Sequence, residues 1–136
     1  MMNAYLSLVS LHVASAIFGL GPLGVLAVSA SRSPAPADPE RFARQLRIVR
    51  WGLLGMFLTG AALIAATHGA LGKTGWMRFS FALFVLLGAL HGLTSRSVGR
   101  ALNQSPFAQP RSTAPMLWAM SILVLAITYL MEAKPW

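Results

Sequence analysis

Long uncharged apolar runs, separated by short polar or basic connectors, dominate the pattern of hydrophobic and polar positions along the chain. The runs cover residues 6–30, 51–72, 79–95 and a last stretch that ends at Met131. An α-helix rises about 1.5 Å per residue, so roughly 20 apolar residues cross a hydrocarbon layer about 30 Å thick. The pattern predicts four membrane-spanning helices, at about residues 4–30, 39–72, 76–103 and 113–132.

Proline, glycine and capping residues mark the ends of these helices. The proline-rich segment 31–40 interrupts the chain after the first helix, and Asp38 followed by Pro39 is a typical N-cap and first helical position. The polar turn 72–75 joins the second and third helices. Since no connector is long enough for a separate domain, we predict an all-α, polytopic four-helix bundle that forms one membrane domain over residues 1–136.

Composition supports this class of protein. Hydrophobic residues make up 56% of the chain and charged residues only 10%, against roughly 25% in soluble domains. The formal charge of +8 argues against nucleic acid as a partner, because the basic residues flank apolar runs instead of forming a water-facing surface. The chain has no cysteine, which excludes disulfides and thiolate metal sites. A cleavable signal peptide is the alternative for the first run, but no Lys or Arg precedes it and it is longer than a signal core.

The basic residues predict the orientation. Eight lie in the connectors after the first and third helices, and three lie on the other side. The eight are Arg32, Arg41, Arg44, Arg47, Arg50, Arg96, Arg100 and Arg111, and the three are Lys73, Arg78 and Lys134. By the positive-inside rule we expect a bacterial inner (cytoplasmic) membrane protein with both termini outside. We interpret Arg41, Arg44, Arg47 and Arg50 as contacts to the headgroups of the lipid bilayer.

Three histidines are the candidates for chemistry. His12 lies about two turns inside the first run, where an ionisable side chain is costly without a partner. The topology puts His12 and His68 in the same outer half of the bilayer, and His91 near the other face. Two histidines from different helices at similar depth suit axial ligation of a b-type haem in a four-helix bundle. We predict His12 and His68 as haem-iron ligands, and His91 as a further cofactor-binding residue or a structural hydrogen-bonding group.

Small residues and other side chains complete the candidate set. Gly19, Gly60, Gly88 and Gly92 are predicted helix-packing positions, the last two in a GxxxG pattern. Copper is a weaker candidate than haem because no methionine cluster accompanies an outer histidine. Hydrolytic catalysis finds no support, since all three carboxylates lie outside the apolar runs.

Several short motifs resemble the CopD-like superfamily of small bacterial membrane proteins. They are Leu11-His12-Val13 with Gly19, Thr59-Gly60, and the stretch from Arg78-Phe79 through Leu90-His91 to Arg96 and Arg100. That superfamily includes the copper-resistance protein CopD, the HemJ protoporphyrinogen oxidases and uncharacterised branches. The resemblance implies a four-helix core and, for the HemJ branch, a b-type haem on a first-helix histidine that matches His12.

The sequence therefore predicts an integral membrane protein that binds haem b for electron transfer or a redox step. Whether the protein is an enzyme stays open. Two alternatives remain: a cofactor-free accessory subunit of a larger membrane complex or homo-oligomer, which would pack through the Gly88 and Gly92 face, and a copper or small-solute permease.

Overall fold

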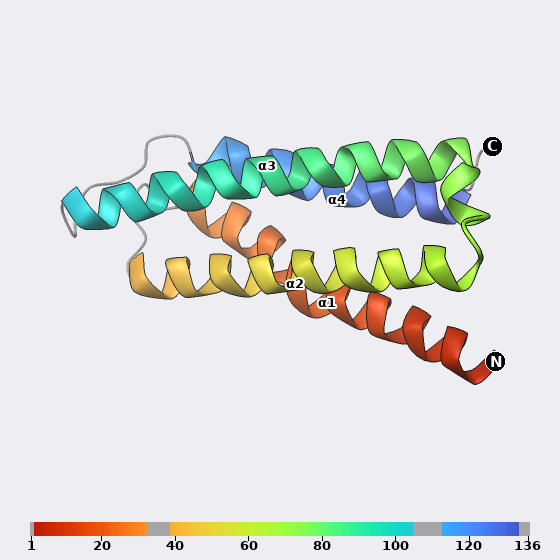
Figure 1. Ribbon diagram of the computed structural model, residues 1–136. Helices are drawn as coiled ribbons and strands as arrows, with labels where there is room; N and C mark the ends of the chain where they lie inside the picture. Colours follow the sequence, from red (N-terminus) through yellow and green to blue (C-terminus); the bar gives the residue numbers. More distant parts are fainter. Residues whose placement is uncertain (1, 33–38, 105–112, 134–136) are drawn as a thin grey trace.

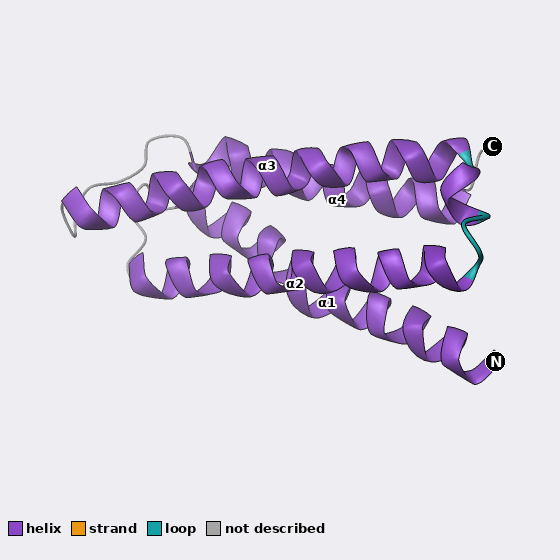
Figure 2. Ribbon diagram, viewed as in Figure 1, coloured by secondary structure: helices purple, strands orange, loops and turns teal. Residues whose placement is uncertain are grey.

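The computed structural model describes residues 2–32, 39–104 and 113–133, and its regular secondary structure there is entirely helical. Four long α-helices and one short 3-10 helix are present (Figure 2). They are α1 (Met2–Arg32), α2 (Pro39–Ala66), η1 (Leu71–Lys73), α3 (Gly75–Gln104) and α4 (Thr113–Ala133). Each α-helix is long and apolar enough to cross a membrane. The predicted all-α, four-span membrane fold is confirmed. Asp38, Arg111 and Lys134 lie outside the described residues.

The helices run alternately up and down, so that the start of α1, the end of α2, the start of α3 and the end of α4 share one end of the bundle (Figure 1). Helix α1 packs along both α2 and α4, and α3 packs along α4. The interface between α2 and α3 is the least extensive of the four. A hydrogen bond from Trp118 Nε1 to Ser31 Oγ, 2.9 Å long, also joins α4 to α1.

Helices α1 and α2 cross at two glycines, Gly19 and Gly52. Both are buried, and a Cβ atom added to either one would collide with the Cα atom of the other. Only residues without side chains permit this direct backbone contact, which is a common device where transmembrane helices cross closely. The sequence predicted a packing role for Gly19, and the structure identifies Gly52 as its partner.

Large apolar side chains cover much of the outer surface of the bundle. Phe18, Leu125 and Tyr129 are each more than two-thirds exposed, although a soluble protein would bury most such groups. Between 22% and 28% of each spanning window is buried inside the protein. Lipid tails are the solvent that suits the remaining surface, as expected for an integral membrane protein.

Helix α2 ends at Ala66, earlier than the predicted residue 72. The amide of His68 bonds the carbonyl of Ala65, and the amide of Gly69 bonds the carbonyl of Ile64, which is the Schellman pattern of helix termination. His68 adopts a φ of 50° and Gly69 a φ of 79°. Because left-handed backbone cannot continue a right-handed helix, the chain turns here into η1 and then α3.

Candidate functional site

A cavity of about 480 Å³ lies among all four helices, at the end of the bundle that carries the start of α1 and the turn between α2 and α3. Its lining is mostly apolar, and half of the lining residues are aromatic or carry a thioether: Tyr5, Phe57, Trp76, Phe81, Phe84, Met56, Met77 and Met131. The polar groups that reach it are few, His12 and Ser80 among them. Binding sites for cofactors and small ligands have volumes of about 300–1,000 Å³ and this kind of lining.

His12 is held in place by Thr59 of α2. The distance from His12 Nδ1 to Thr59 Oγ1 is 2.7 Å. The hydroxyl of Thr59 lies 2.7 Å from the carbonyl oxygen of Gly55 and 3.3 Å from that of Met56. A carbonyl can only accept, so the single hydroxyl proton of Thr59 points to these oxygens, and Thr59 Oγ1 must accept from His12. The hydrogen bond therefore orients the imidazole ring.

This hydrogen bond also selects the tautomer of His12. Since Nδ1 donates its hydrogen to Thr59, the neutral ring has an unprotonated Nε2. The side-chain hydrogen bond of the ring is made by Nδ1, and the backbone of Met56 is a further hydrogen-bonding group beside the ring. Histidines that bind metals in proteins commonly show this arrangement, in which one ring nitrogen donates to an oxygen of another residue and the other nitrogen is the ligand. His12 thus offers a fixed electron pair at the wall of the cavity.

Gly60 and Ser80 also line the cavity. A Cβ atom on Gly60 would lie 3.5 Å from Cε1 of His12, an ordinary van der Waals contact, so the ring lies directly against this glycine. On the α3 side of the cavity, Ser80 is 2% exposed, and its hydroxyl has no hydrogen-bond partner among the described residues. A buried hydroxyl without a partner costs about 1–3 kcal/mol, which a polar group inside the cavity would offset.

The structure does not place His68 with His12. His68 is exposed in the turn after α2, and it is absent from the cavity lining. The partner of His12 is Thr59, where the sequence pointed to His68. The geometry of the turn thus gives His68 a backbone role at the end of a helix, and it leaves His12 as the histidine of the cavity.

His91 has a different environment from His12. It is 5% exposed, and its Nε2 lies 2.9 Å from the carbonyl oxygen of Leu46 in α2. Because a carbonyl oxygen only accepts, Nε2 carries the hydrogen and has no free electron pair for a metal. His91 therefore joins α3 to α2 at the opposite half of the bundle, as in the structural alternative that the sequence left open.

The predicted packing glycines divide into two groups. Gly19 and Gly60 lie at close contacts within the chain, as described above, whereas a Cβ atom on Gly88 or Gly92 would meet no atom within 4 Å. The GxxxG pair of α3 therefore makes no close helix contact with the described residues. Within this chain, close helix packing depends on Gly52 in place of that pair.

Sequence reasoning missed the roles of Thr59 and Ser80. Thr59 was conspicuous only as part of a short motif, because a hydroxyl in an apolar helix usually bonds its own backbone. Ser80 gave no signal at all. No group of three or more His, Cys, Asp or Glu side chains lies together within residues 2–32, 39–104 and 113–133, so a metal held only by such ligands has no candidate site there.

Comparison with known proteins identifies the family. No curated protein and no solved structure matches the chain. A family model described as "Predicted integral membrane protein (DUF2269)" matches residues 6–95, which is about two-thirds of the chain. The matched region contains His12, Thr59, Ser80 and His91, and it also contains most of the residues that line the cavity. With four membrane-spanning helices and this match, the chain belongs to the DUF2269 family of predicted integral membrane proteins.

Proposed function

We propose that this membrane protein binds a b-type haem in the cavity beside His12 and works as an electron carrier or redox protein. The observation that carries the proposal is the 2.7 Å hydrogen bond between His12 Nδ1 and Thr59, which leaves Nε2 as an unprotonated nitrogen at the cavity. A haem iron requires an axial ligand of this kind. The resemblance of the His12, Thr59-Gly60 and His91 motifs to CopD-like proteins supports the same ligand.

The lining of the cavity fits such a group. Aromatic rings and aliphatic side chains dominate it, and they suit a flat apolar macrocycle while keeping water from the iron. Met56, Met77 and Met131 provide three thioethers in the same lining as His12, which corrects the expectation that no methionine cluster accompanies an outer histidine, and His–Met is a known pair of haem-iron ligands. The unpartnered hydroxyl of Ser80 gives the cavity a polar group that a bound molecule would satisfy. We therefore propose His12 with a methionine, in place of His12 with His68, as the ligand pair.

The chain's own contribution would be binding, orientation and control of the potential. Bound haem would supply a one-electron iron couple. Thr59 would fix the ring of His12 and raise its basicity as a ligand, and the apolar walls would lower the local dielectric. The cavity lies at the bundle end opposite the start of α2, which carries Arg41, Arg44, Arg47 and Arg50. With the orientation that the basic residues predict, the site would face the outer half of a bacterial inner membrane.

The absorption spectrum of the purified full-length protein tests this proposal. Protein from haem-replete cells should show a Soret band that the His12→Ala variant loses. The matched control is His68→Ala, which removes an exposed histidine at the same end of the bundle and should leave the band unchanged. A wild-type protein without a Soret band would refute the proposal and would favour the cofactor-free accessory subunit.

A further inference from the structure

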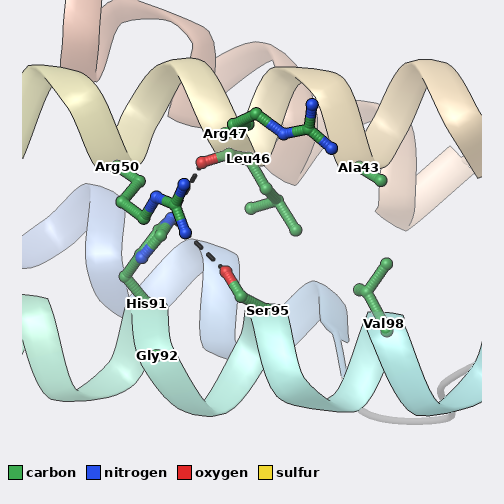
Figure 3. Close-up of a pocket in the computed structure, with 9 residues that line it drawn as sticks. Ala43, Leu46, Arg47, Arg50, His91, Gly92, Ser95 and Val98 are labelled. Carbon is green, nitrogen blue, oxygen red and sulfur yellow. Dashed lines mark hydrogen bonds between the residues drawn. The ribbon is translucent and has the colours of Figure 1, made fainter.

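A second cavity, of about 280 Å³, lies between α2 and α3 at the basic end of the bundle. Figure 3 shows its two walls, with Arg47 and Arg50 on α2 and His91 and Ser95 on α3. This cavity is separate from the one beside His12, and the two share no lining residue. The proposed haem site does not use it.

Small residues create this space. Gly92 and Gly99 line the α3 wall, and a Cβ atom on either one would meet no atom within 4 Å. Ala43 faces them from α2. Larger side chains at these three positions would fill the gap between the helices. The helices are instead held by His91, whose Nε2–H donates to the carbonyl of Leu46 across the interface.

The charge at this cavity is positive and uncompensated. Arg47 and Arg50 are both exposed, and neither forms an ion pair with a residue that the structure describes. The guanidinium carbon of Arg50 lies 5.8 Å from the centre of the Trp51 ring, a contact that leaves its N–H donors available. No carboxylate lines the cavity. Two arginines beside one hollow are a site for an anion, because each guanidinium presents several donors in a fixed plane.

The α3 wall adds a further donor. Ser95 Oγ lies 3.5 Å from Nε2 of His91, which already donates to Leu46. At that distance the contact is weak, so the hydroxyl hydrogen of Ser95 is available to another acceptor. In Figure 3 the side chain of Arg50 reaches across from α2 toward α3, on the side where His91 and Ser95 lie. Donors from both helices thus border one space.

We propose that this cavity binds a phosphate group, from either a membrane phospholipid or a soluble phosphate ester. Arg47 and Arg50 would donate to the phosphate oxygens and Ser95 would add one hydrogen bond, while Gly92 and Gly99 leave room for the group. Planar guanidinium pairs match phosphate oxygens in geometry and charge. The arginines extend the amphipathic start of α2, where the chain meets the lipid headgroups, so a phospholipid can reach the site from the bilayer. This goes beyond general headgroup contact, because it is a single built site between two helices.

Native mass spectrometry of the full-length protein in detergent tests the proposal. The probes are phosphatidylglycerol, phosphatidylcholine and glycerol 3-phosphate, each titrated separately. The charge variant is Arg47→Gln with Arg50→Gln, and its matched control is Arg44→Gln with Arg100→Gln, which removes two arginines from the same end but none from the cavity. The space variant is Gly92→Leu, and its control is Gly88→Leu, another open position on α3 that does not line the cavity.

We expect one tight phosphatidylglycerol or glycerol 3-phosphate per protein, with affinity reduced at least tenfold in the charge variant and in Gly92→Leu, and less than twofold in either control. Tight binding of phosphatidylglycerol or phosphatidylcholine with this pattern identifies a lipid as the source of the phosphate, and tight glycerol 3-phosphate binding identifies a soluble ester. If none of the three probes binds, or if test and control variants lose affinity equally, the proposal is wrong. The Gly92→Leu comparison retains all the arginines and so separates a built site from general charge attraction.

Discussion

The two sides of α2 are built in opposite ways. Toward α1, Gly19 and Gly52 bring the two backbones into direct contact. Toward α3, the helix is less extensively packed, and a cavity lies along this side at each end of the bundle. Between α2 and α3, the hydrogen bond from His91 to Leu46 is a specific polar contact. One helix therefore carries both the tightest contact of the bundle and its most open interface.

This difference shows how a small membrane protein can combine rigidity with binding space. Because lipid tails are as apolar as leucine, transmembrane helices associate by close packing and polar contacts, with little help from the hydrophobic effect. The glycine crossing of α1 and α2 holds His12 against Thr59 and Gly60. The more loosely packed side of α2, toward α3, then leaves room for a ligand next to the oriented ring of His12. The close packing of α2 against α1 thus supports the more loosely packed interface between α2 and α3.

The largest expected effect comes from a substitution that forces α1 and α2 apart where Gly19 and Gly52 cross. Gly19→Leu places a side chain where the backbone of Gly52 lies, so the helices must separate and α2 loses its packing on α1. We expect a loss of about 3 kcal/mol in unfolding free energy, at the upper end of the cost of overpacking a close-packed interior. Titration with SDS, followed by circular dichroism, measures it. Gly24→Leu on the same helix, where a Cβ has open space, should change stability little. Equal losses in the two variants would contradict the glycine crossing.

A smaller effect should follow from removing the hydrogen bond by which His91 joins α3 to α2. His91→Leu removes the donor to the Leu46 carbonyl but keeps an apolar side chain at a buried position. Interhelical hydrogen bonds in membranes contribute on the order of 1 kcal/mol, and we expect a loss of that size in the same titration. The control is Leu93→Ala, at a position that is 52% exposed. An unchanged His91→Leu protein would mean that packing alone holds α2 and α3 together.

The smallest expected effect is at the turn that connects α2 and α3. His68 has a φ of 50°, which costs an L-residue about 1–2 kcal/mol, while glycine adopts it without strain. Glycine also increases the conformational entropy of the unfolded chain, which lowers the stability of the folded state by about 0.4–1 kcal/mol. The net gain for His68→Gly should be about 0.5 kcal/mol. Thermal unfolding in detergent measures it, and His68→Ala, which retains the strain, should show no gain. A destabilised His68→Gly protein would show that the imidazole itself has a stabilising contact.

The sequence alone predicted the four spans and the all-α class, because apolar runs of membrane length separated by arginines and prolines have few other interpretations. It also directed attention to His12, since an ionisable group inside such a run is conspicuous. The end of α2 was predicted too late. A left-handed histidine at position 68 is a backbone state that residue type hardly signals, and Gly69 was the only local indication.

The residues that contact His12 or complete the site could not be predicted from the sequence, for a different reason. Depth along a helix can be counted from the sequence, but the direction in which a side chain points around the helix axis depends on packing. His12 and His68 were predicted at the same depth, whereas the contact that forms is between His12 and Thr59. Ser80 could not be predicted either, because its distinguishing property is a buried hydroxyl without a hydrogen-bond partner among the described residues, and that property is visible only in the structure. Gly52 became important only through its position opposite Gly19.

Chemical rescue of His12 tests the central proposal most directly. The His12→Gly protein retains the cavity but lacks the nitrogen ligand, so it should be purified without a Soret band. Free imidazole added together with haem should restore the band, and the wild-type spectrum should not change when imidazole is added. We expect this restoration because the proposed role of His12 is to present one nitrogen to the cavity. A His12→Gly protein that retains the full Soret band without imidazole, or a wild-type protein that binds no haem, would contradict the proposal.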